Sequence, residues 1–330
     1  MINAKTQIIA EIAQGYEGDI KQCERFVRLA KKCGADGVKF QIFEVEELCL
    51  PNYKHYDLFK SLYIQPTEWK KIIAICNEIG IDFYVDIFGL NTLKWMRECN
   101  IKGIKIHSSD LKNYELLSEL KDKKLRIILG VGGSTFVEIQ KAIELLGDNE
   151  IVVMSGFQAE PNFAEDIELN KIKLIKDKLK VEVGYTDHIE VTNPLTISVS
   201  AMAVIMGATY IEKHLTFERD FLQLEDFISA LNPEEFKIMV KMIRDVEKFP
   251  NPHSQSFELT EREKAYRKSS KKVILASKEI IKGTLITKED IVMLRTGEDY
   301  TELLDIEEII GKKAILDINK YKIIRKEFIQ

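Results

Sequence analysis

The chain has 330 residues, of which 45% are hydrophobic and 31% are charged, and its formal net charge is −5. This length and composition predict one large hydrophobic core with room for a small second domain. Lysine and glutamate are interspersed, and no apolar run approaches the roughly 18 residues that span a bilayer. We therefore expect no nucleic-acid partner, no membrane segment and a cytoplasmic location. The five cysteines form no Cys-x-x-Cys pair, which is typical of reduced thiols.

Eight short runs rich in β-branched and aromatic residues alternate with longer amphipathic segments in the first 249 residues. In chain order these predicted strands are QIIAEIA from Gln7, GVKFQIF from Gly37, DFYVDIF from Asp82, GIKIHSSD from Gly103, RIILGVGG from Arg126, IVVMSGFQ from Ile151, VEVGYTDH from Val181 and YIEKHLT from Tyr210. The segments between them, such as TEWKKIIAICNEIG, carry apolar residues at helical spacing. Eight β-α units in about 250 residues predict a closed (β/α)8 TIM barrel over residues 1–249.

The pattern changes after the barrel. Residues 250–270 are polar and contain proline, which predicts a linker with a short helix. Within residues 271–330, the segment KEIIKGTLITKEDI (278–291) is echoed by LDINKYKIIRKEFI (316–329), with isoleucine, lysine and glutamate at matching positions. This echo predicts a small, β-rich domain built from two similar halves.

Polar residues gather where the predicted strands end, and in a TIM barrel those ends form the active-site face. Lys39 and Lys105 lie inside otherwise apolar strands, where a charge is costly unless it is paired. They therefore indicate either an anionic ligand or a buried carboxylate partner. His188 and His214 end the last two strands, which are neighbours in a barrel, so their imidazoles could bind one divalent cation.

Several segments resemble the sialic acid synthase family, whose members use phosphoenolpyruvate to make N-acetylneuraminic, legionaminic and pseudaminic acids. The resemblance spans nearly the whole chain. It rests on EIAQGYEG (11–18), GADGVKFQ (34–41), IKIHSSD (104–110), GYTDH (184–188) and GATYIEKHLT (207–216). Residues 271–330 resemble the SAF, or antifreeze-like, domain of β-clip type that is appended to those enzymes, with MLRTGED at 293–299.

The resemblance implies a role for each matched position. Phosphoenolpyruvate would be held by Lys39, Lys105 and Ser108, with Thr186 supplying a hydroxyl and Gln41 counted among the substrate-binding residues. His188 and His214 become the ligands of Mn²⁺ or Mg²⁺. Catalytic carboxylates are expected at Asp110 and Glu11, and Asp226 would contact the sugar together with Glu11. Arg295 would reach from the SAF-like domain of one subunit into the barrel of another, which implies a domain-swapped homodimer.

These roles predict a synthase that condenses phosphoenolpyruvate with the aldehyde of an open-chain N-acyl amino or deoxy hexose. The product would be a nine-carbon 3-deoxy-2-ulosonic acid plus phosphate, formed with C–O cleavage. Asp86 stands where the family has a threonine that contacts phosphate, and Gly130 replaces another phosphate-binding hydroxyl. These two departures leave open a metal-dependent aldolase or lyase that does not use phosphoenolpyruvate. A non-catalytic carbohydrate-binding protein is a third interpretation.

Overall fold

The structure is a computed structural model that describes residues 5–156, 162–219, 228–249, 257–297 and 304–330. The chain divides into two compact units, Met1–Pro252 and His253–Gln330. The division falls within the segment predicted as a linker, and the helix expected there is α11, Glu261–Ser270.

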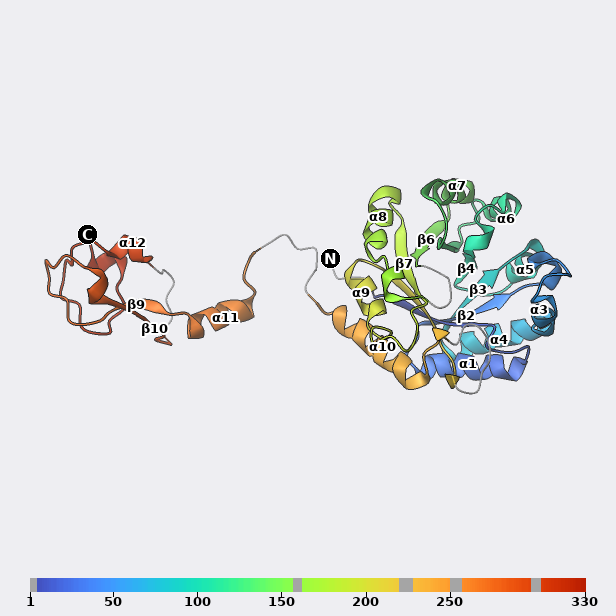
Figure 1. The fold of residues 1–330 in the computed structure, drawn as a ribbon, viewed down its shortest axis with the longest axis horizontal. Helices are drawn as coiled ribbons and strands as arrows, with labels where there is room; N and C mark the ends of the chain where they lie inside the picture. Colours follow the sequence, from blue (N-terminus) through green and yellow to red (C-terminus); the bar gives the residue numbers. More distant parts are fainter. Residues whose placement is uncertain (1–4, 157–161, 220–227, 250–256, 298–303) are drawn as a thin grey trace. The chain divides into compact units, whose positions relative to one another are not determined.

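The first unit is a closed barrel of eight parallel strands, in which β8 pairs with β1 (Figure 1). All eight strands occur where the sequence predicts them, so the barrel is confirmed. The strands are β1 (Gln7–Ala13), β2 (Gly37–Ile42), β3 (Asp82–Ile87), β4 (Gly103–Ile106), β5 (Arg126–Gly130), β6 (Glu150–Ser155), β7 (Glu182–Asp187) and β8 (Tyr210–His214).

Helices surround the barrel (Figure 1). They are α1 (Ile20–Lys32), α2 (Val45–Leu48), α3 (Tyr56–Ser61), α4 (Pro66–Ile79), α5 (Leu90–Met96), α6 (Tyr114–Leu120), α7 (Phe136–Leu146), α8 (Asn170–Leu179), α9 (Val199–Ile205) and α10 (Pro233–Val246). Helix α4 shows why such segments fold. Proline begins it, and Gly80 ends it with a left-handed φ of 69° that costs glycine little. Its buried residues recur at helical spacing and face the strands.

The barrel interior is filled in layers, because alternate residues of each strand point inward. The layer nearer the amino ends of the strands is mainly apolar and consists of Ile9, Tyr84, Ile128, Val152, Met154 and Tyr210. Two residues further along, β1, β3 and β8 carry Glu11, Asp86 and Glu212 in their buried interiors. The interior thus changes from apolar to ionic toward the carboxyl ends.

The second unit contains α11, α12 (Ile306–Ile309) and a two-stranded antiparallel sheet of β9 (Val273–Ala276) and β10 (Ile291–Leu294). The sequence predicts a β-rich domain. Its regular strands are short, and several further pairings are isolated bridges. The predicted internal repeat is visible in these pairings. Ala276 pairs with Ile291, and the equivalent residues Ala314 and Ile329 form a matching bridge.

The two halves of the repeat also meet each other. Ile280 and its counterpart Ile318 exchange both backbone hydrogen bonds, at 2.9 and 2.8 Å. Their side chains share one apolar cluster, which also contains the equivalent pair Ile286 and Ile324. The repeat therefore builds a single core from two intertwined halves.

Two further observations concern the sequence predictions. All five cysteines are free thiols. In the part of the chain that the structure describes, no helix is both long enough and apolar enough to cross a membrane.

Candidate active site

Five charged side chains meet inside the barrel, one layer above its apolar floor. We call this group the ionic cluster; it consists of Glu11, Lys39, Asp86, Lys105 and Glu212. They come from β1, β2, β3, β4 and β8, and every one is at most 2% exposed. Closure of the barrel brings them together, because β8 lies beside β1. Charges buried this deeply must be paired.

Glu212 joins the two lysines of the cluster. Its Oε1 accepts a hydrogen bond from Lys105 Nζ at 2.6 Å, and its Oε2 lies 3.1 Å from Lys39 Nζ. Asp86 Oδ2 lies 3.4 Å from Lys39 Nζ and 3.9 Å from Lys105 Nζ. Lys39 also forms an ion pair with Glu11. Of the two partners that the sequence allowed for the buried lysines, the structure shows the carboxylates.

Burial and pairing act in opposite directions on the cluster's pKa values. Burial alone would lower the pKa of Lys39, but the neighbouring carboxylates outweigh it and the pKa lies well above its usual value. Burial alone would raise the pKa of Glu212, yet Lys105 and Lys39 hold it well below the usual range. For Glu11, burial prevails over Lys39 and raises the pKa to about 7. Glu11 therefore retains a proton more readily than Glu212 does.

His188 and His214 face each other at the ends of β7 and β8. Their ring centroids are 5.1 Å apart, and both side chains are buried. Burial lowers the pKa of His188 to about 3, and burial followed by the His188 charge lowers the pKa of His214 well below its usual value. Both rings are consequently neutral, which is the form that binds metal ions.

The histidine pair fits a divalent cation on its own chemistry. His188 Nδ1 is buried and has no hydrogen-bond partner among the described residues, so this nitrogen is not committed to another group. Those residues contain no group of three or more His, Cys, Asp or Glu side chains arranged to hold a metal. A cation bound by this pair would complete its coordination with water and substrate oxygens, leaving positions open for chemistry.

A second buried ion pair lies on the outer side of the same two strands. Lys213 Nζ donates to Asp187 Oδ1 at 3.1 Å and to the Ile189 carbonyl at 3.3 Å. Asp187 also accepts from Ser200 Oγ, in α9, at 2.8 Å. Asp187 directly precedes His188, and Lys213 directly precedes His214. This outer pair therefore ties together the two strand ends that carry the histidines.

The remaining predicted residues of the barrel lie around the same mouth. Thr186 is buried, and its Oγ1 has no hydrogen-bond partner in the described part of the chain. Ser108 and Asp110 bound a short 3₁₀ helix that follows β4. Asp110 accepts from Ser109 Oγ at 3.0 Å and from Asn113 Nδ2 at 2.9 Å, which fixes both of its oxygens.

Two predicted residues lie outside the described part of the first unit. Asp226 lies outside the described residues. Arg295 follows β10 in the second unit, where its side chain is exposed. Their roles stay predictions.

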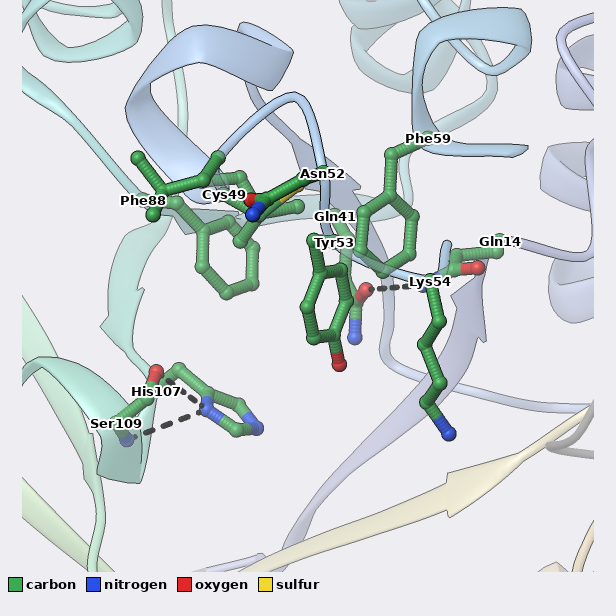
Figure 2. Close-up of a pocket in the computed structure, with 12 residues that line it drawn as sticks. Gln14, Gln41, Cys49, Asn52, Tyr53, Lys54, Phe59, Phe88, His107 and Ser109 are labelled. Carbon is green, nitrogen blue, oxygen red and sulfur yellow. Dashed lines mark hydrogen bonds between the residues drawn. The ribbon is translucent and has the colours of Figure 1, made fainter. Parts of the chain in front are cut away.

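A cavity of about 700 Å³ lies at the carboxyl ends of β2, β3 and β4, where Gln41, Phe88 and His107 line it (Figure 2). Gln41 lines it and accepts a hydrogen bond from Gln14 at 3.5 Å. The cavity is lined by Gln14, Gln41, Leu48, Cys49, Leu50, Asn52, Tyr53, Lys54, Phe59, Phe88, His107 and Ser109. Much of this wall comes from the chain between α2 and α3, to which the sequence assigned no function.

Sequence reasoning placed Glu212 among the polar residues at the strand ends but gave it no role in the site. A usable signal was present, because Glu212 lies two positions before His214 in a strand and must share its face. Asp86 was interpreted as an anion placed against a phosphate. The structure instead places it between two lysines, which compensate its charge.

Both the sequence and the fold are similar to those of known proteins. The NeuB family model matches residues 26–253. The chain is 33% identical to an uncharacterised protein of Methanocaldococcus jannaschii, over 93% of this chain and 90% of that protein. It is 27% identical to the N,N'-diacetyllegionaminic acid synthase of Legionella pneumophila, over 94% and 91% of the two chains.

A solved structure of a sialic acid synthetase is also similar to this chain. The N-acetylneuraminic acid synthetase of Leptospira borgpetersenii serovar Hardjo-bovis, crystallised with citrate, superposes with a TM-score of 0.72 and 25% identity. The match covers 81% of this chain and 93% of that one. The resemblance to sialic acid synthases that the sequence predicts is thereby confirmed, and the chain belongs to the NeuB family.

Proposed function

We propose that this protein is a metal-dependent synthase that condenses phosphoenolpyruvate with an open-chain N-acyl amino or deoxy hexose. The products are a nine-carbon 3-deoxy-2-ulosonic acid and phosphate. One observation carries the proposal: two buried lysines and two neutral, facing histidines share one barrel mouth. The named synthases among its relatives support the same reaction class.

The two lysines of the cluster are the groups that would bind an anionic donor. Phosphoenolpyruvate brings a phosphate and a carboxylate, and Lys39 and Lys105 offer the ammonium groups that offset such charge. Ser108 and the unpartnered Thr186 hydroxyl would donate hydrogen bonds to the same anion. Ion pairs with Asp86 and Glu212 hold both lysines inside the barrel until the donor binds.

The reaction balances with these groups. The C3 carbon of phosphoenolpyruvate forms a bond to the aldehyde carbon, water adds at C2, and the bond between C2 and the bridging oxygen breaks as phosphate leaves. Mn²⁺ or Mg²⁺ held by His188 and His214 would supply electrophilic polarisation of the aldehyde. Asp110, whose two oxygens are fixed by neighbours, would take the proton of the attacking water.

The direct test is phosphate release. Purified protein with phosphoenolpyruvate, Mn²⁺ and a panel of aldoses is expected to release phosphate with at least one sugar. Lys105→Met and His188→Gln should each lower that rate by about 100-fold or more, since single electrostatic groups contribute about that much to catalysis. Lys60→Met, an exposed lysine of α3, serves as the matched control. Failure of every sugar, together with no binding of phosphoenolpyruvate, contradicts the proposal.

A metal-dependent aldolase or lyase acting on a ulosonic acid is the second candidate. The pairing of both lysines with Asp86 favours it, because no uncompensated positive charge waits for a phosphate. This alternative predicts that phosphoenolpyruvate does not raise the melting temperature and that pyruvate is a substrate. A melting temperature that rises with phosphoenolpyruvate concentration contradicts it.

We further propose that residues 271–330 act as an SAF-like domain in a domain-swapped homodimer, with Arg295 completing the barrel of the partner subunit. The exposed position of Arg295 supports this role. Mixed dimers of Arg295→Ala and His214→Gln should regain activity that neither variant has alone. Mixtures that stay inactive, or a monomer by light scattering, would count against the swap.

A further inference from the structure

The cavity at the carboxyl ends of β2, β3 and β4 has a preformed aromatic wall. Ring contacts run in an unbroken series from Tyr53 to Phe59 (centroids 6.1 Å apart), to Phe43 (5.6 Å), to Phe88 (5.8 Å) and to His107 (5.8 Å). This series joins the chain between α2 and α3 to the end of β4. Because each ring is packed against the next, the cavity keeps its shape without a ligand.

The same cavity lies at the barrel mouth, at the ends of strands that carry the ionic cluster. Gln41 lies on β2, and Phe88 and His107 directly follow β3 and β4; each is two positions after a cluster residue. The cavity therefore lies on the same face of the barrel as the carboxyl ends of the strands that carry Lys39, Asp86 and Lys105.

The charge of the cavity lining is positive. Lys54 is its only charged side chain, and none of the described residues that line the cavity is Asp or Glu. Within the described part of the chain, Lys54 makes no ion pair or side-chain hydrogen bond. Burial lowers the pKa of His107, so this ring adds no charge. Figure 2 shows Tyr53 and Lys54 extending in the same direction from their loop, with the amides of Gln14 and Gln41 nearby.

We propose that this cavity binds the acceptor sugar and selects one that carries an anionic group, a phosphate ester or a carboxylate, at the end remote from its aldehyde. The inference rests on the proposed function, because it takes the molecule in the cavity to be the acceptor. Lys54 binds the anion at the rim, assisted by the Tyr53 hydroxyl and the Asn52 amide. The aromatic wall packs against the C–H face or the acyl group of the sugar. The aldehyde end then points to the cluster and the histidines.

Equilibrium binding tests the inference independently of turnover. N-acetylmannosamine, N-acetylglucosamine and N-acetylgalactosamine are each compared with their 6-phosphate and with the corresponding uronic acid by titration calorimetry. At least one anionic member is expected to bind about ten-fold or more tightly than its neutral parent, as a charge-assisted hydrogen bond allows. The phosphate and uronate arms identify which anion is preferred.

Two variants assign the preference to Lys54. In Lys54→Met the Kd of the neutral sugar divided by the Kd of its anionic counterpart should fall to near one. In Lys60→Met, which removes an exposed lysine of α3 outside the cavity, the ratio should stay at the wild-type value. Equal affinities for neutral and anionic sugars, no binding of any anionic member, or a ratio that survives Lys54→Met would each overturn the inference.

The outcomes also separate this inference from the proposed function. Phosphate release from phosphoenolpyruvate with neutral sugars as efficiently as with anionic ones leaves the synthase standing and removes the anionic specificity. Preferential binding of anionic sugars without consumption of phosphoenolpyruvate contradicts the synthase and retains an anion-selective cavity.

Discussion

The charged residues inside the barrel show what a single side chain can reveal in a sequence. Lys39 and Lys105 stand out because they interrupt apolar strands, and this alone predicts a paired charge. The identity of the partners could not be predicted from the residues, because Glu212 lies far along the chain and reaches the lysines only when the barrel closes. Lys54 was missed for a different reason. It sits in an irregular segment without periodicity, where no pattern marks a side chain as part of a cavity.

Glu212 supports a prediction at this scale. Glu212→Gln removes the carboxylate that joins Lys39 and Lys105, and breaking such a buried pair costs about 3 kcal/mol or more. Urea unfolding of the metal-free protein, followed by tryptophan fluorescence, measures the loss, since both tryptophans, Trp69 and Trp95, belong to the barrel.

An exposed ion pair provides the control for this measurement. Glu68→Gln removes the partner of Lys71 at the surface and should change the free energy of unfolding by less than about 1 kcal/mol. Equal effects of the two substitutions would show that the cluster does not stabilise the barrel.

At the scale of secondary-structure elements, a prediction concerns the ends of β7 and β8. Lys213→Met leaves Asp187 buried without its cation and loosens the link between the two strand ends. Mn²⁺ affinity should fall by about 10-fold or more, as it does when residues that orient metal ligands are lost. Electron paramagnetic resonance of free Mn²⁺ measures this affinity without any substrate. An affinity within two-fold of wild type would show that the outer ion pair does not support metal binding by the histidines.

The second unit gives a prediction for pH. Lys278 and the Thr287 backbone hold the pKa of Asp290 below its usual value near 3.8, with Lys278 Nζ 2.7 Å from its carboxylate. A depressed pKa stabilises the fold above the usual value, and this stabilisation is lost as the pH falls below it. The melting temperature of the second unit, followed through the amide NMR signals of Ile280 and Ile318, should therefore drop on acidification from about pH 6 to about pH 3. Asp290→Asn should be less stable at pH 6 and should lose most of this dependence; an unchanged pH profile would contradict the assignment.

Elements were easier to predict than their contacts. The eight strands follow from β-branched runs between helical segments, because each strand is buried on both faces and needs little long-range information. The repeat of the second unit was also visible as matched isoleucines. Its pairings were not, because the two halves intertwine through isolated bridges that have no local pattern.

At the scale of the whole molecule, family membership and the closed barrel agree with the order of motifs along the chain. The barrel brings strand ends from distant parts of the sequence to one mouth, and this explains how lysines, carboxylates and histidines can serve one reaction. The ionic cluster and both histidines belong to the first unit. The proposed chemistry is therefore a property of the barrel, to which the second unit would contribute Arg295.

The most direct measurement of the central claim follows the bridging oxygen of phosphoenolpyruvate. The protein is incubated with Mn²⁺, an accepted sugar and phosphoenolpyruvate labelled with ¹⁸O at that oxygen, and the phosphate and sugar product are analysed by mass spectrometry. The proposed synthase predicts labelled phosphate and an unlabelled product whose mass is the sum of the sugar and pyruvic acid. Label retained in pyruvate or in the sugar product, or a product that forms equally well from pyruvate, would contradict it.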